Sequence, residues 1–385
     1  MYKVLDVFSG AGGMAEGFLR AGFSIPYASD ISAQAKETYV NRHKQLGYEV
    51  EFLNDDLNKI LNDKETINDL QAQSFDVIIG GPPCQGFSNA GKRKQEDKRN
   101  LLVKGYLKMI NLIRPKVFVM ENVVGMESFI FNDFVGIKGK KYSRRKIVDI
   151  LAEEFGDLGY TVNRVVLNAS DYGVPQNRRR VFFLGSYDGV VGIKTPNKHN
   201  RIVSAYDALE DLVSGRIGSD YQKESITGRV KGANGKSIKR KKITNNEKTV
   251  HTNLTTERFK LIRPGGSLKE AFSLLDEMEK EKYKTKKNNC KRLCPDTPSP
   301  TVVTLPDDYV HYSEDRIMTV RELARLQSFD DSFEFLGKRT TGGDRRKVET
   351  PQYTLVGNAV PPLLAYAVAC SVKEALDESK GRIKV

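Results

Sequence analysis

Cys84 lies in the part of the sequence best suited to nucleophilic chemistry. It follows the apolar run 77–79 and the pair Pro82-Pro83, and Gln85 comes directly after it. Three β-branched residues are too few for a helix and suit a buried strand, and two prolines fix φ and remove N–H donors just before the thiol. A lone cysteine is more often a buried structural residue. In this context, however, the pattern predicts a thiol held at the carboxyl end of a strand, where open α/β sheets bind ligands.

One carboxyl group and two arginines accompany other predicted strands. Glu121 and Asn122 stand near the end of the apolar strand 116–123, and both glutamate and asparagine are poor residues for a strand interior, so a role at that place is indicated. Arg178 and Arg180 alternate where another apolar strand begins, which would place them on one face of it. Surface arginines are the plain alternative.

A glycine-rich turn follows the first predicted strand, 3–8, and precedes a predicted helix over 14–21. Such a turn lets a backbone approach a ligand closely, and the following helix N-terminus favours a carboxylate or a phosphate. The turn departs from Gly-x-Gly-x-x-Gly, so by itself it fits a dinucleotide site or a simple turn equally well.

Acidic residues follow the second and third predicted strands, 24–30 and 50–53. Asp30 ends the second strand, the place expected of a carboxylate that accepts ribose hydroxyls. Asp56 follows the third strand and could bond an adenine amino group. A helix cap is the alternative for Asp55 or Asp56.

Together these motifs resemble those of the cytosine-5 DNA methyltransferases. The resemblance rests on Pro-Pro-Cys-Gln at 82–85, Glu-Asn-Val at 121–123, Gln-x-Arg-x-Arg at 176–180 and Gly-Asn-Ala-Val-Pro-Pro at 357–362. It implies an α/β fold, the Rossmann-like doubly wound sheet of S-adenosylmethionine-dependent methyltransferases, with a smaller target-recognition domain. Residues 1–187 and 314–385 would form the catalytic and cofactor-binding domain, and residues 188–313 the domain that recognises DNA.

The resemblance also implies roles for single residues. Cys84 would add to C6 of cytosine, Glu121 would protonate N3 if burial raises its pKa, and Arg180 would hold O2. Because C6 is out of reach inside a duplex, the base would be flipped out. The expected catalytic residues are Cys84, Glu121, Arg178 and Arg180. The residues expected to bind S-adenosylmethionine are Asp6, Phe8, Gly10, Gly12, Gly13, Asp30, Ile31, Asp56, Leu57, Pro83, Leu102, Asn358 and Val360. The residues expected to contact DNA are Gln85, Ser88, Arg99, Lys239 and Arg240.

Composition agrees with a polyanionic partner. The chain of 385 residues has 62 Lys and Arg against 49 Asp and Glu, a net charge of +13. The stretch 229–248 is strongly basic, and we expect it to contact phosphates. Four cysteines indicate no disulfide framework, and Cys290 and Cys294 have no second pair at metal-binding spacing, so no metal is expected. No apolar run approaches the roughly 18 residues of a membrane span, so we expect a cytoplasmic protein. We expect it to act as a monomer on double-stranded DNA. A restriction endonuclease would recognise the same site without forming a stable complex with it.

Three alternative functions remain open on the sequence alone. A tRNA methyltransferase would share the fold, but that branch typically has Pro-Phe-Thr after Pro-Cys-Gln, whereas this chain has Gly-Phe-Ser. A non-catalytic, sequence-specific DNA-binding protein would be expected to lose Cys84, Glu121 or Arg180 first, and all three are present. A nucleotide-dependent oxidoreductase would explain the glycine turn alone.

The remaining elements follow from the periodicity of apolar residues. We expect an insertion over 129–141, an amphipathic helix over 143–158, and strands over 161–167 and 178–183. Thr319 and Glu322 predict a capping box for a helix within 316–329. An apolar helix is expected from 362 to about 375.

Overall fold

The computed structural model describes residues 1–83, 102–199, 201–285, 287, 290–341, 345 and 348–382. It has two compact units. The first comprises Met1–Asn168, Arg179–Lys198 and Pro362–Val385, and the second comprises Ala169–Arg178 and His199–Pro361. Residues 314–361, predicted to belong to the catalytic domain, are therefore part of the second unit. The functional boundaries after residues 187 and 313 stay a prediction.

Seven strands of the first unit form one sheet, in the order β3-β2-β1-β4-β5-β9-β8. The strands are β1 (Lys3–Val7), β2 (Ser24–Ser29), β3 (Glu51–Leu53), β4 (Val77–Gly80), β5 (Val117–Val123), β8 (Tyr160–Asn168) and β9 (Arg179–Tyr187). The first five of these in the sheet order are parallel, and β9 runs antiparallel to both of its neighbours. The chain returns from β3 to place β4 beside β1, so the sheet has a topological switch point between β1 and β4. Open α/β sheets bind ligands at such points, and the doubly wound class predicted from the sequence is confirmed.

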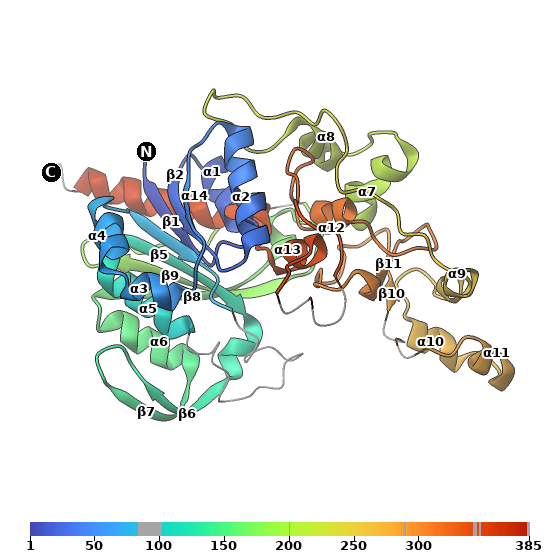
Figure 1. Ribbon diagram of the computed structural model, residues 1–385, viewed down its shortest axis with the longest axis horizontal. Helices are drawn as coiled ribbons and strands as arrows, with labels where there is room; N and C mark the ends of the chain where they lie inside the picture. Colours follow the sequence, from blue (N-terminus) through green and yellow to red (C-terminus); the bar gives the residue numbers. More distant parts are fainter. Residues whose placement is uncertain are drawn as a thin grey trace. The chain divides into compact units, whose positions relative to one another are not determined.

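Helices cover both faces of this sheet. They are α1 (Gly13–Arg20), α2 (Ala33–Leu46), α3 (Leu57–Asn62), α4 (Lys64–Ala72), α5 (Leu102–Ile113), α6 (Ile147–Gly156) and α14 (Pro362–Arg382). Figure 1 shows α1, α2 and α14 on one face, with α3 to α6 on the other. Gly17 of α1 allows a close helix pair, because a Cβ there would lie 2.4 Å from the Tyr366 nitrogen of α14.

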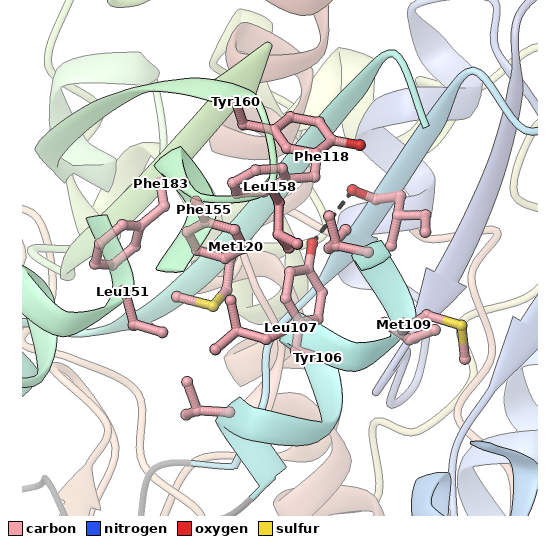
Figure 2. Packing of buried hydrophobic residues seen from close by; sticks show 14 of the residues in the cluster. Tyr106, Leu107, Met109, Phe118, Met120, Leu151, Phe155, Leu158, Tyr160 and Phe183 are labelled. Atoms are coloured by element: carbon pink, nitrogen blue, oxygen red, sulfur yellow. Dashed lines mark hydrogen bonds between the residues drawn. The ribbon is translucent and has the colours of Figure 1, made fainter. Parts of the chain in front are cut away.

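The core between the sheet and α5–α6 is rich in aromatic rings. Figure 2 shows Tyr106, Phe118 and Phe155 packed together, and the rings of Phe118 and Phe155 stack with centroids 4.1 Å apart. The Tyr106 hydroxyl lies inside this core and donates to the Ile78 and Val119 carbonyls, at 3.3 and 3.0 Å. A buried tyrosine thus ties α5 to β4 and β5 without an unsatisfied polar group.

A two-stranded ribbon stands where the sequence predicted an insertion and the start of a helix. It consists of β6 (Ile130–Val135) and β7 (Lys141–Lys146), reached from β5 through the 3-10 helix η2 (Val124–Ser128). The prediction of a helix over 143–158 was wrong at its start: α6 begins at Ile147, because the preceding residues pair with β6. The apolar periodicity that suggested the helix lies wholly within 147–155.

The second unit consists mainly of short helices. They are α7 (Ala205–Ser214), α8 (Asp220–Thr227), α9 (Asn253–Lys260), α10 (Leu268–Ser273), α11 (Glu277–Lys282), α12 (Val320–Leu326) and α13 (Gln352–Asn358). The strands β10 (Lys291–Arg292) and β11 (Tyr309–Val310) pair with each other, and η3 (Ala169–Tyr172) and η4 (Pro306–Asp308) are 3-10 turns. The predicted capping box of α12 is confirmed: the Thr319 hydroxyl accepts from the Glu322 N–H, and the Glu322 carboxylate accepts from the Thr319 N–H.

In the described part of the chain, one helical stretch is long and apolar enough to cross a membrane by length and composition alone. It spans Gln352–Gly381, and 72% of its most apolar window is buried within the protein. A core helix passes the same test, so the stretch is weak evidence for a membrane span.

Candidate active site and cofactor site

Glu121 and Arg180 form an ion pair across neighbouring strands. Glu121 lies on β5 opposite Phe182 of β9, and Arg180 lies two residues before Phe182, so both side chains project from the same face. The Arg180 Nε lies 2.9 Å from the Glu121 Oε1, and the two side chains are 13% and 12% exposed. The Arg180 Nη1 donates to the Arg179 carbonyl at 2.8 Å. Beyond this ion pair, the Arg180 Nη2 has no hydrogen bond to a described residue.

The segment that leads to Cys84 lies against the end of β5. A Cβ on Gly81 would lie 3.1 Å from the Glu121 Oε2, so the carboxylate sits beside the Gly81 backbone. The next residue of β5, Asn122, is buried and donates from Nδ2 to the Pro82 carbonyl at 3.1 Å. Glu121 and Asn122 therefore both contact the chain within three residues of Cys84.

The glycine turn has the backbone that its sequence requires. Phe8, Gly10 and Gly12 have φ values of 57°, 54° and 95°, and α1 starts directly after Gly12. A Cβ on Gly12 would meet the Tyr39 ring at 3.0 Å, whereas a Cβ on Gly10 would have no atom within 4 Å. The Gly10 side of the turn is therefore open for a ligand.

Asp30 closes this turn from the end of β2. Its Oδ2 accepts from the Gly10 N–H at 2.9 Å, and its Oδ1 accepts from the Ser32 N–H at 2.8 Å. Burial raises the pKa of Asp30, and these two backbone hydrogen bonds act in the opposite direction. Each carboxylate oxygen has a second lone pair, so Asp30 can still accept from a ligand hydroxyl.

Asp6 lies inside the protein rather than at the open side of the turn. Its carboxylate is 1% exposed and accepts a hydrogen bond from the Tyr39 hydroxyl at 3.1 Å. Burial raises its pKa to about 8, the charge of Asp30 adds to this rise, and the Tyr39 hydrogen bond opposes it.

The end of β3 and the start of α5 supply further predicted cofactor residues. Asp56 caps α3, with its Oδ1 accepting from the Asn58 N–H at 2.7 Å. Leu57 is buried, and a Cβ on Gly105 of α5 would lie 3.1 Å from it. Ile31 is 69% exposed directly after Asp30, which leaves an apolar side chain facing solvent there.

An acid and an arginine thus meet beside the approach to a cysteine, and a glycine turn with an acid lies at the switch point of the same sheet. A family model, C-5 cytosine-specific DNA methylase, matches residues 2–374. The chain belongs to this family. The family, the fold class and the activity of a DNA cytosine methyltransferase, predicted from the sequence, are therefore confirmed.

Named relatives of this methylase cover nearly the whole chain. The type II methyltransferase M.DdeI of Desulfomicrobium norvegicum is 35% identical over 95% of the chain and 87% of its own length. The type II methyltransferase M1.HphI of Haemophilus parahaemolyticus is 34% identical over 96% of the chain and 86% of its own length. A solved E. coli structure, described as a DNA modification methyltransferase encoded within a prophage, has a TM-score of 0.69 at 24% identity and covers 98% of this chain and 100% of its own. This last likeness concerns the fold alone.

The residues of this methylase at the turn fit the cofactor of S-adenosylmethionine-dependent methyltransferases. The Ser9 hydroxyl is buried and has no hydrogen-bond partner among the described residues. It lies beside the open Gly10, in the turn that Asp30 closes. The Ser9 hydroxyl can donate to a ligand carboxylate, the Asp30 carboxylate can accept from ribose hydroxyls, and the open side of Gly10 leaves space between them for the ligand.

Arg178 has a different environment from the one predicted. Strand β9 begins at Arg179, so Arg178 does not share its face with Arg180, and it belongs to the second unit. Its guanidinium donates to the Val302 and Gly357 carbonyls, both at 3.1 Å. These bonds stabilise the second unit, and a catalytic role for Arg178 stays a prediction.

For the other predicted residues of the second unit, contact with a ligand stays a prediction. Asn358 is exposed at the end of α13, and Val360 is buried. Lys239 is exposed, whereas Arg240 donates to the Asp331 carboxylate at 2.8 Å and is therefore engaged within the unit.

Four predicted residues lie outside the described residues: Cys84, Gln85, Ser88 and Arg99. Pro83, Gly13 and Leu102 are described, at the end of the segment after β4 and at the starts of α1 and α5.

Sequence reasoning gave no role to two residues that the structure connects to these sites. Tyr39 binds Asp6, and Ser9 presents a hydroxyl with no hydrogen-bond partner among the described residues. Asn122, which binds the Pro82 carbonyl, was expected to have a role at the end of its strand, because asparagine is a poor strand residue like the neighbouring glutamate. Tyr39 lies 33 residues from Asp6 in the chain and gave none.

Proposed function

We propose that this methyltransferase carries a methyl group from S-adenosylmethionine to C5 of a cytosine flipped out of a specific duplex sequence, through a covalent adduct with Cys84. The observation that carries the proposal is the position of the Glu121–Arg180 pair beside Gly81, with the neighbouring Asn122 bonded to the Pro82 carbonyl. An acid and a guanidinium next to the approach to a thiol are the groups that addition to a pyrimidine ring requires.

Cys84 acts as the nucleophile in this scheme. C5 of cytosine is a weak nucleophile, and addition of the Cys84 thiolate across the C5–C6 double bond makes C5 enamine-like. The negative charge that develops in the ring is met by a proton at N3 from Glu121, a general-acid contribution of about 10² to 10⁴ in rate. The Arg180 Nη2, which has no hydrogen bond to a described residue, donates to the cytosine O2 and stabilises the same charge. Once the methyl group is on C5, the C5 proton is lost to water, and elimination breaks the Cys84–C6 bond, restores the double bond and frees the thiol.

The cofactor binds at the glycine turn. Asp30 accepts from ribose hydroxyls, Ser9 and the N-terminus of α1 receive the carboxylate of the methionine part, and Ile31 covers the adenine with its exposed apolar side chain. Bound there, S-adenosylmethionine supplies an electrophilic methyl group on a sulfonium. The family resemblance adds Asn358 and Val360 to the residues expected to bind the cofactor.

The substrate is double-stranded DNA. Gln85, Ser88 and Arg99 contact the DNA around the flipped base, and Lys239 with the basic stretch 229–248 binds phosphates. We further propose that the enzyme is a cytoplasmic monomer, and that it protects DNA from a restriction endonuclease that reads the same site.

The proposal is tested by methyl transfer from labelled S-adenosylmethionine to unmethylated duplex DNA and to tRNA in parallel, with Cys84→Ser as the control. Label in DNA only, absent with Cys84→Ser and mapped to 5-methylcytosine in one sequence, is the expected result. Label in tRNA would assign the chain to the RNA branch. Label in neither substrate would favour a protein that binds DNA without modifying it.

A further inference from the structure

The ribbon β6–β7 is strongly basic and has no role in the scheme above. Residues 129–146 contain six basic side chains and one acidic one, Asp133. Figure 1 shows the ribbon as a separate two-stranded element beside α6.

One face of the ribbon is fixed to the first unit by aromatic rings. Phe131, Phe134 and Tyr142 are each 4% exposed and belong to the core cluster that includes α6. The buried Glu154 of α6 accepts from the Tyr142 hydroxyl at 2.7 Å and from the Ile137 N–H at 2.8 Å. The ribbon is therefore held in one orientation on α6.

Three of the six cations turn toward α6 and are paired there. Lys140 and Arg145 both bind the Glu153 carboxylate, and the Lys138 Nζ donates to the Asp157 carbonyl at 2.7 Å. These contacts fasten the ribbon further and leave these three side chains occupied.

The other three cations, Lys141, Arg144 and Lys146, are exposed and have no partner among the described residues. Lys141 pairs in register with Val135 and Lys146 with Ile130, so no acid stands opposite them. Val135 and Ile130 are 45% and 44% exposed. Uncompensated cations set among exposed apolar side chains form a surface suited to a polyanion whose backbone carries both charge and apolar sugar edges.

The ribbon starts shortly after the carboxyl end of β5, the strand that carries Glu121. Only residues 124–129 separate the end of β5 from β6, and Met126 within them is buried. The Ile147 N–H donates to the Phe129 carbonyl at 3.0 Å, which closes the base of the ribbon at the same place. The unpaired cations thus begin next to the active-site strand.

We propose that the outer face of this ribbon, formed by Lys141, Arg144 and Lys146, binds the phosphate backbone of duplex DNA beside the target cytosine. The proposal rests on the proposed function and extends it, because it assigns a second DNA-contacting element to the unit that holds Glu121. A pre-oriented ribbon loses little conformational freedom on binding, and its contacts add affinity without reading sequence.

The test compares two triple variants of equal charge. One is Lys141→Gln with Arg144→Gln and Lys146→Gln. The control is Lys44→Gln with Lys64→Gln and Lys108→Gln, three exposed helix lysines of the same unit with no described partner. Binding to a duplex with the mapped target site is measured over a salt series, and methyl transfer is measured at saturating DNA.

The association constant K falls as salt rises, so the slope of log K against log salt is negative. We expect the ribbon variant to make this slope shallower by about 1 for each cation removed, about 3 in all. We also expect it to weaken binding at low salt by about tenfold or more while the rate at saturating DNA stays at the wild-type value. Equal slopes for the ribbon variant and the wild type would overturn the proposal, as would an equal change in the control. The charge-preserving variant Lys141→Arg, Arg144→Lys, Lys146→Arg should keep the wild-type slope. A shallower slope for this variant would count against the proposal. Absence of methyl transfer by the wild type itself would refute the proposed function instead.

Discussion

The Tyr39 hydroxyl donates a hydrogen bond to the buried Asp6 carboxylate at 3.1 Å. The Tyr39 ring also stacks on His43, with centroids 4.5 Å apart, and meets the Phe52 ring edge-on at 5.3 Å. A Cβ on Gly12 would touch the same ring. One side chain therefore connects β1, the glycine turn and β3, and it shields the Asp6 carboxylate from water.

This shielding predicts a pH dependence of stability. The pKa of Asp6 rises from 3.8 to about 8 on folding. Between these values the folded protein keeps a proton that the unfolded chain has lost, so this contribution to stability is full below about pH 4 and is lost as the pH rises toward 8. Asp6→Asn removes the titration. We expect the melting temperature of Asp6→Asn, relative to the wild type, to rise steadily from pH 5 to 8 and to level off above it.

Thermal unfolding of both proteins across this pH range is the measurement. The exposed Asp133→Asn serves as control and should keep a constant offset from the wild type. A constant offset for Asp6→Asn as well would show that Asp6 titrates normally.

Glu121→Gln should abolish most of the activity without changing the fold. The amide keeps an oxygen for the Arg180 Nε, 2.9 Å away in the wild type, but it cannot deliver a proton. We expect the single-turnover rate of methyl transfer to fall by about 10² to 10⁴, with an unchanged melting temperature and unchanged DNA affinity. Residual activity above about a tenth of the wild type would remove Glu121 from the general-acid role.

Asn122 provides a related test of positioning. Asn122→Ala leaves the Pro82 carbonyl without its buried donor, a loss of about 1 to 3 kcal/mol. We expect a lower melting temperature and a reduced rate, together with a change in the rate at which a small alkylating reagent modifies Cys84. A reduced melting temperature with wild-type alkylation would confine Asn122 to a structural role.

Local patterns predicted much of the fold, because local physics determines those parts. The all-buried strand at 77–80 and the capping box of Thr319 need only their own residues to be recognised. The ribbon strand Lys141–Lys146 was missed because five of its six residues are polar or charged, and only its pairing with β6 makes it a strand.

The sites were predictable as motifs but not as contacts. Alternation suggested that Arg178 and Arg180 share a face, yet Arg178 bonds carbonyls 124 and 179 residues away in sequence. No periodicity encodes such partners. The bond between Tyr39 and Asp6 is equally long-range, whereas the position of Glu121 at the end of a strand was visible because glutamate fits a strand poorly.

The two glycines of the turn should respond differently to alanine. Gly12→Ala would press a methyl group against the Tyr39 ring at 3.0 Å with φ at +95°, so we expect a lower melting temperature and weaker cofactor binding. The methyl group of Gly10→Ala would have no atom within 4 Å, and the left-handed backbone at φ +54° should lower the free energy of unfolding by only about 1 kcal/mol. If the free space receives S-adenosylmethionine, Gly10→Ala should weaken cofactor binding by about tenfold or more with a small change in melting temperature.

Calorimetric titration with S-adenosylmethionine and thermal unfolding separate these effects. Gly235→Ala is the matched control, since Gly235 has a φ of +76° and no atom within 4 Å of its Cβ position, and it lies in the second unit. Cofactor binding by Gly10→Ala that equals that of Gly235→Ala would place the ligand elsewhere.

Arg325 should be far more important for stability than Arg240, although both bind Asp331. Arg325 is 0% exposed and forms hydrogen bonds of 2.6 to 2.9 Å with both Asp211 and Asp331, whereas Arg240 is partly exposed and bonds Asp331 at 2.8 Å. Arg325→Met leaves the buried Asp211 without its bidentate partner and leaves Asp331 with only the partly exposed Arg240, a loss of about 3 to 5 kcal/mol. Arg240→Gln leaves Asp331 paired with Arg325 and should cost about 1 kcal/mol or less. Thermal unfolding measures both variants.

Arg240 and Lys239 should differ in DNA binding. If the role of Arg240 is to bind Asp331 within the second unit, Arg240→Gln should bind DNA as the wild type does, while Lys239→Gln weakens binding. Equal weakening by both variants would show that Arg240 contacts DNA, as predicted from the sequence.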